Sequence, residues 1–160
     1  MFIETSIPLL EEILGEWQQE IGNDFQAYKN HIYRVVHFCL MLHRSNEVER
    51  EKIIIAGCFH DLGIWTHHTF DYLQPSIELV RNYLKQAEKQ SWFDEIVSMI
   101  NFHHKITCTQ NINYPLVEIF RQADWVDVSR GMLHFGLSKE QIESVKKNFR
   151  IQVFINGWFN

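Results

Sequence analysis

The sequence predicts an all-α fold of about seven helices. Three observations predict this class: the 160 residues include only 7 Gly and 3 Pro, apolar residues recur at steps of three and four, and no segment has a convincing strand pattern. Apolar residues make up 46% of the chain, which is enough to form a core. Because the length suits one domain and no linker or repeat interrupts it, we expect residues 1–160 to form a single domain.

The first half of the chain contains three of the expected helices. The first is expected over residues 8–21, where one apolar stripe follows Pro8, a residue that suits the first turn. The second is expected over residues 25–43, with Asp24 as its cap. The third is expected over residues 47–61, and its last part, IIIAGCF, is apolar all round. A helix without a polar face is usually buried at the centre of a fold.

The second half of the chain contains four more helices, separated by polar segments. Gly63 is expected to stop the third helix, and a loop follows it at about residues 65–70. The last helix starts with Ser138 as N-cap and has Gln141 three residues later, which is a capping-box pattern. The four helices are expected at about residues 73–89, 92–104, 116–130 and 138–156.

Charge and cysteine content narrow the classes of function. The formal net charge is −5, so the protein is not expected to have the basic surface that nonspecific binding to a nucleic-acid polymer requires. The longest apolar run is far shorter than the ~20 residues that cross a membrane, and no signal peptide is recognisable, so we expect a cytoplasmic protein without a membrane partner. The odd number of cysteines fits buried thiols better than a disulfide framework; these are Cys39, Cys58 and Cys108.

A histidine and an aspartate end the most apolar helix. Burying His60 and Asp61 there is costly unless both are satisfied, so they are either hydrogen-bonded core residues or metal ligands. Two further residues favour a metal: His31 lies on an inward face of the preceding helix, and Asp124 lies in another apolar helix. Mixed nitrogen and oxygen ligands suit Mn, Fe, Co, Ni or Zn, and four of them leave positions open for a water molecule.

The chain contains three sequence elements in a fixed order, which are HIYRVV, AGCFHDLG and IFRQADWVD. In this order and with their flanks, they resemble the HD superfamily of metal-dependent phosphohydrolases. The first has Arg34 three residues after its histidine, and the third has Asp127 three residues after Asp124. The resemblance extends over about residues 30–131 and is more specific than the HD dipeptide alone.

The resemblance implies a single helical HD domain that hydrolyses a small phosphoester, such as a nucleotide, by means of a metal-activated water. Arg34 would then neutralise charge on the phosphoryl oxygens, or else form a structural ion pair with Asp127 or Glu118. Asp127 would orient a ligand or Arg34 rather than bind metal itself. The metal ligands that the resemblance implies are His31, His60, Asp61 and Asp124.

A second group of histidines leaves open whether one or two ions bind. HD proteins often place second-metal ligands where His103 and His104 lie, and His67 or His68 could contribute from the loop. Otherwise His103 and His104 are candidates for proton transfer or for contact with the phosphate. A di-iron oxygenase and a noncatalytic binding module of the same superfamily are the alternative functions. A homodimer is compatible with the sequence, although no motif indicates one.

Overall fold

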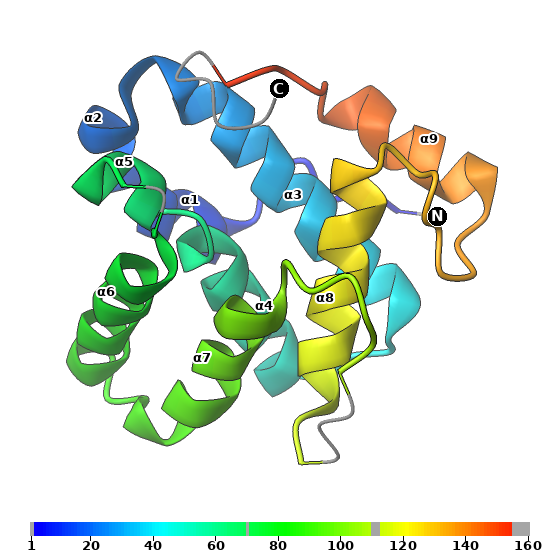
Figure 1. Ribbon diagram of the computed structural model, residues 1–160. Coiled ribbons are helices and arrows are strands. Elements are labelled where there is room, and N and C mark those ends of the chain that lie inside the picture. Colours follow the sequence, from blue (N-terminus) through cyan, green and yellow to red (C-terminus); the bar gives the residue numbers. More distant parts are fainter. Residues whose placement is uncertain (1, 70, 110–112, 155–160) are drawn as a thin grey trace.

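Helices make up the fold throughout the residues that the computed structural model describes, which are residues 2–69, 71–109 and 113–154 (Figure 1). Seven helices in this part have eight residues or more, four shorter ones lie between them, and no strand occurs among the described residues. The prediction of an all-α fold with about seven main helices is therefore confirmed. In chain order the helices are α1 (Pro8–Gly15), α2 (Gln18–Ile21), η1 (Gly22–Asp24), α3 (Phe25–Leu42), α4 (Glu47–Phe59), α5 (Gly63–His67), α6 (Leu73–Gln86), η2 (Gln90–Trp92), α7 (Phe93–Phe102), α8 (Pro115–Val128) and α9 (Lys139–Asn148).

The central helix is α3, which packs against α8, α4 and α9. Figure 1 shows α3 running through the middle of the molecule. α7 packs against α8, α4 and α6, so elements far apart in the sequence enclose one core. The helices in the described part of the chain include none that is long and apolar enough to cross a membrane. The core contains large, fully buried side chains, among them Tyr28, Tyr33, Phe38, Phe59 and Phe120.

The sequence of α4 explains its central place. Asn46 and Glu49 form a capping box at its start, in which each side chain accepts a hydrogen bond from the other residue's backbone N–H. The apolar run IIIAGCF is buried throughout, as predicted. Within that run Gly57 faces α3, where an added Cβ would lie only 3.2 Å from the side chain of Ile32. The absence of a side chain at Gly57 therefore allows α3 and α4 to approach closely.

Two predicted boundaries in the first half of the chain are wrong. The helix expected over residues 8–21 ends at Gly15 and resumes at Gln18, because glycine is a weak helix former and Trp17 leaves the helical region. The loop expected at residues 65–70 is helical at its start, because α5 extends to His67 and buries Trp65, and residue 70 lies outside the described residues. Asp24 makes no cap hydrogen bond to α3, since its Oδ2 accepts one from Trp65 Nε1 at 3.1 Å.

Gly63 begins α5 and does not stop a helix, contrary to the prediction. Its backbone N–H donates a hydrogen bond to Ser76 Oγ at 2.9 Å. A Cβ at this position would overlap with the backbone carbonyl oxygen of Tyr72. The chain that follows the His60–Asp61 pair is therefore packed directly against the start of α6.

The last helix ends at Asn148 and does not reach residue 156 as predicted. Its capping box between Ser138 and Gln141 is confirmed. The chain leaves the helix because the ring of Phe149 is buried against Tyr33, with the ring centroids 4.6 Å apart. Residues 149–154, here named the C-terminal strap, are not helical, whereas 155–156 lie outside the described residues.

The cysteines only partly follow the prediction. Cys39 and Cys58 are buried thiols on α3 and α4. Cys108 is exposed, because it lies in the segment between α7 and α8 and not on a core-facing helix. The prediction of three buried thiols is therefore wrong for Cys108.

Candidate metal centre

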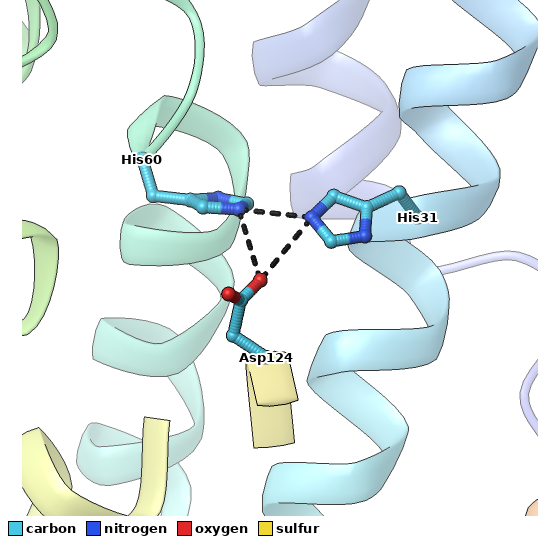
Figure 2. A group of neighbouring side chains, drawn as sticks. All are labelled: His31, His60 and Asp124. Atoms are coloured by element: carbon cyan, nitrogen blue, oxygen red, sulfur yellow. Dashed lines mark hydrogen bonds and ion pairs between the residues drawn. The ribbon is translucent and has the colours of Figure 1, made fainter. Parts of the chain in front are cut away.

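Three helices bring together four side chains that metals commonly use as ligands. His31 lies on α3, Asp124 lies on α8, and His60 and Asp61 directly follow α4. Figure 2 shows His31, His60 and Asp124 pointing toward one another. The Nε2 atoms of the two histidines are 3.0 Å apart, and Asp124 Oδ1 lies 3.4 Å from His31 Nε2 and 3.7 Å from His60 Nε2. Asp61 Oδ2 lies 3.2 Å from His60 Nε2.

Hydrogen bonds at Nδ1 of His31 and His60 define the tautomer of each imidazole ring. His60 Nδ1 donates to the carbonyl oxygen of Gly57 at 2.7 Å, and His31 Nδ1 donates to Asp127 Oδ2 at 2.7 Å. Because these oxygens accept only, each neutral ring carries its proton on Nδ1 and a lone pair on Nε2. Two lone pairs that face each other at 3.0 Å repel unless a proton or a metal ion lies between them.

The carboxylates of this cluster leave acceptor atoms unsatisfied. Asp61 Oδ1 and Asp124 Oδ1 are buried and lack a hydrogen-bond partner among the described residues. Leaving such atoms without a partner is costly, and a bound cation would satisfy both of them. Two imidazole nitrogens and two carboxylates form a donor set that suits a first-row divalent metal ion. The residues present therefore fit a metal.

The electrostatics of the buried cluster also indicate a site for positive charge. Burial alone would lower the pKa of His31, but the carboxylates of Asp124 and Asp127 raise it to about 9. Burial likewise opposes charge on His60, and Asp61 with Asp124 raises its pKa to about 10. Burial would raise the pKa of Asp61, yet His60 and His103 hold it well below its usual value. In the absence of metal, protons on the histidines would supply this charge, and a metal ion would displace them.

Asp127 contacts the cluster through His31, and Arg34 contacts Asp127. Arg34 Nε and Nη2 donate to the two carboxylate oxygens of Asp127 at 2.5 and 2.9 Å, which is a bidentate ion pair. Arg34 Nη1 donates to the backbone carbonyl oxygens of Phe149 and Arg150 in the C-terminal strap. Of the alternatives that the sequence left open for Arg34, the structure shows the ion pair with Asp127. Asp127 also accepts a hydrogen bond from His31 Nδ1, so it contacts both His31 and Arg34, while its predicted role in orienting a metal ligand stays a prediction.

The histidines of the second group differ in burial, since only His103 is buried beside the cluster. His103 Nδ1 donates to the carbonyl oxygen of Ile100 at 2.6 Å, and its Nε2 lies 3.3 Å from Asp61 Oδ1. His103 is buried and forms a second set of potential metal ligands with His60 and Asp61. His104 is exposed and adjacent to His103. His67 and His68 are exposed and belong to neither ligand set found among the described residues.

Comparison with known proteins agrees with this geometry. The family model of the HD domain matches residues 28–129, more than half of the chain and the whole of the cluster. The chain belongs to the HD-domain family. No curated protein and no solved structure gives a significant match. Membership means that the chain has the fold of metal-dependent hydrolases.

A cavity of about 270 Å³ opens from the candidate metal centre of this HD domain. At its inner end lie polar side chains of the cluster, among them Asp61, His103 and Asp124. Apolar and aromatic groups from α8, from the start of α6 and from the C-terminal strap form much of the remaining wall. The cavity is therefore polar beside the cluster and more apolar toward solvent, which suits a ligand with one charged and one apolar end.

Sequence reasoning missed several residues of this cavity. Tyr72 was not predicted as a site residue, but it lines the cavity with its ring centroid 6.4 Å from that of His103. Burial and the nearby charge of Asp61 raise the pKa of Tyr72, so its hydroxyl keeps its proton. Arg130 and the C-terminal strap were not assigned to the site at all. Only the aromatic content near the motifs was a signal for Tyr72, and no motif marks the strap.

Proposed function

We propose that this HD-domain protein is a divalent-metal-dependent phosphohydrolase that acts on a small phosphoester. The observation that carries the proposal is the convergence of His31, His60, Asp61 and Asp124 at the inner end of an open cavity. Their lone pairs and unsatisfied oxygens need a cation, and the cavity gives a substrate access to it. A divalent ion bound there would acidify a water molecule and polarise a phosphoryl oxygen.

The geometry of the histidines favours one metal ion bound by all four ligands. His60 belongs to both potential ligand sets, but its Nδ1 is used by Gly57, so only Nε2 is left to bind metal. The same nitrogen cannot serve two ions. An ion held by His31, His60, Asp61 and Asp124 would therefore leave His103 and one oxygen of Asp61 for other partners.

The surrounding residues hold this arrangement in place. The backbone carbonyl of Gly57 keeps His60 in the tautomer that presents Nε2 to the cluster, and Asp127 does the same for His31. Arg34 holds Asp127 through two hydrogen bonds. Because the donors of Arg34 are used by Asp127 and the strap, Arg34 acts as a positioning residue and does not bind the phosphoryl group in this proposal.

Two groups beside the cluster can assist hydrolysis, one by proton transfer and one by hydrogen bonding. Hydrolysis forms a bond from the water oxygen to phosphorus, breaks the phosphorus–oxygen ester bond and requires a proton on the departing alcohol. His103 Nε2 lies 3.3 Å from Asp61 Oδ1 and at the cavity wall, so it can accept the proton of the attacking water and then transfer it to the oxygen of the departing alcohol. Tyr72 keeps its hydroxyl proton and can donate a hydrogen bond to the phosphoryl group. His104, on the same wall, is placed to contact the substrate phosphate.

One observation favours a second candidate function, a two-iron oxygenase. The two oxygens of Asp61 face different histidines, with Oδ2 toward His60 and Oδ1 toward His103. A carboxylate in this position can bridge two ions. Binding of two irons and consumption of O₂ would support the oxygenase, whereas one equivalent of metal and release of phosphate would support the hydrolase.

The test is metal content together with turnover. Wild-type protein purified without a metal-binding tag, and then loaded separately with Mn, Fe, Co, Ni or Zn, should hold about one equivalent by mass spectrometry of metals. The Asp124→Asn variant should lose that metal, while the matched control Asp71→Asn, on an exposed residue, should retain it. Phosphate release from a panel of phosphomonoesters should follow metal content. Full metal retention in Asp124→Asn, or metal-loaded wild type that releases no phosphate, would contradict the proposal.

A further inference from the structure

The outer part of the cavity has a composition that the metal chemistry does not require. Its wall includes Trp125 and Val128 from α8 and residues 151–154 of the C-terminal strap. Val128 and Val153 are 47% and 61% exposed, so this apolar wall is open to a ligand. Arg130 lies on the rim of the same wall. An apolar surface with one arginine beside it suits an organic group that carries a negative charge.

Arg130 occupies a backbone position where glycine is the usual residue. It has φ +57°, in the left-handed region, and it directly follows Ser129, the C-cap of α8. Its N–H donates to the carbonyl oxygen of Asp127, and the N–H of Gly131 donates to that of Val126, which together form a Schellman motif. An arginine is strained in this position, and such strain recurs at ligand-binding sites.

The two arginines of the cavity differ in what they bind. Arg34 is 4% exposed, and its donors are used by Asp127 and by two carbonyl oxygens of the strap. Arg130 is exposed, and its guanidinium has no ion pair or hydrogen bond among the residues that the structure describes. Arg130 is therefore the arginine of the cavity that remains available to an anionic ligand.

Distance separates Arg130 from the reacting phosphate. Val128, the last residue of α8, follows Asp124 by four residues and so lies roughly 6 Å farther along the helix axis, and Arg130 is two residues beyond it. A cavity of about 150 Å³ accommodates one benzene-sized group, so the space of about 270 Å³ here holds a phosphate and one ring. A phosphate at the metal centre would leave the ring beside Trp125 and the strap, with Arg130 at its far end.

We propose that Trp125, the C-terminal strap and Arg130 form a subsite for the organic part of the substrate, and that this part is a ring-sized apolar group with a negative charge opposite its phosphate. The inference rests on the proposed function, because it takes the cluster as the site of the phosphate. Arg130 is the specificity-determining residue, since it forms an ion pair with the distal charge. The strap and Trp125 contact the ring.

Phosphonates test the subsite without requiring turnover. Phenylphosphonate, 4-carboxyphenylphosphonate and methylphosphonate are titrated calorimetrically into the metal-loaded full-length protein. Wild type should bind the carboxylated compound about tenfold more tightly than phenylphosphonate, as expected for one charge-assisted contact. Phenylphosphonate should bind about tenfold more tightly than methylphosphonate because of the ring contacts.

Variants of Arg130 isolate its contribution to this preference. Arg130→Asn suits the left-handed backbone and should abolish the preference for the carboxylated compound, and Arg130→Glu should reverse it. The matched control is Arg44→Ala, because Arg44 is an exposed arginine outside the cavity; it should retain the wild-type ratio. Circular dichroism and metal content verify that each variant is folded and loaded.

The outcomes of these experiments distinguish failure of the subsite proposal from failure of the hydrolase proposal. Equal affinities for phenyl- and 4-carboxyphenylphosphonate in wild type, a preference that survives in Arg130→Asn, or no binding of any phosphonate would overturn the subsite. Hydrolysis of phenyl phosphate together with one of these results would refute the subsite alone. A preference that depends on Arg130 in a protein that hydrolyses no phosphoester would support the subsite and refute the hydrolase.

Discussion

Replacing Asp127 by asparagine should weaken both the fold and the metal centre. Asp127 is 7% exposed and accepts hydrogen bonds from Arg34 Nε and Nη2 and from His31 Nδ1. Asparagine offers one oxygen and one NH₂ group in place of two oxygens. The NH₂ group must therefore face either the guanidinium or the imidazole N–H, and the charge of Arg34 loses its partner.

The size of the effect follows from burial. Removing one partner of a buried ion pair costs about 3–5 kcal/mol, because the other charge stays buried without compensation. A change in the partner of a metal-binding histidine typically costs about 10- to 100-fold in metal affinity. We therefore expect Asp127→Asn to lose about 3–5 kcal/mol of unfolding free energy in the absence of metal, and to bind metal more weakly.

Urea denaturation followed by circular dichroism, with EDTA present, measures the first effect without interference from metal. Asp71→Asn, on an exposed residue, is the control and should unfold like wild type. In a double-mutant cycle, Arg34→Gln with Asp127→Asn should cost clearly less than the sum of the two single changes. A loss below about 1 kcal/mol in Asp127→Asn, or additive single changes, would refute this account of the pair.

Three further changes test other parts of the structure. His103→Gln should keep the metal but lower kcat about 100-fold or more, if His103 transfers a proton; unchanged steady-state kinetics would exclude that role. Burial lowers the pKa of His37 below its usual 6.5, so its contribution to stability is complete above pH 6.5 and is lost as pH falls toward the folded-state pKa. Between pH 7.5 and 5.5, metal-free wild type should therefore lose more unfolding free energy than His37→Gln, and parallel pH profiles would contradict this. Gly63→Ala should cost about 1–3 kcal/mol in thermal unfolding because its Cβ would meet the carbonyl of Tyr72, whereas Gly15→Ala, with open space around it, should cost nothing; equal melting temperatures for the two variants would be evidence against the close approach.

The four residues of the cluster could be predicted from the sequence because local sequence patterns mark them. His60 and Asp61 stand out because they end a run of residues that is otherwise fully apolar. His31 and Asp124 occur on core-facing positions of two other helices, and helix periodicity places such positions inward. Assembly of the three helices then brought the four side chains within a few ångströms, as the resemblance to HD proteins implied. Their role as metal ligands is still a prediction.

The remaining parts of the site depend on contacts between distant segments. The ion pair between Arg34 and Asp127 joins residues 93 positions apart, so the sequence left its partner open. The last helix was expected to continue to residue 156, but it ends because Phe149 gains burial against Tyr33. Without that break the strap could not reach the cavity. Arg130 was missed because its importance lies in its backbone conformation and in the wall beside it.

In the C-terminal strap, the residues that anchor the segment differ from the residues that line the cavity. Arg34 and Asn30 bind the backbone carbonyl oxygens of Phe149 and Arg150, and every residue has such an oxygen. The residues that line the cavity, from Ile151 onward, follow these anchors. Substitutions at positions 151–153 therefore leave the anchors intact while they reshape the wall. This segment offers a route by which relatives with the same metal centre could diverge in the substrates that they accept.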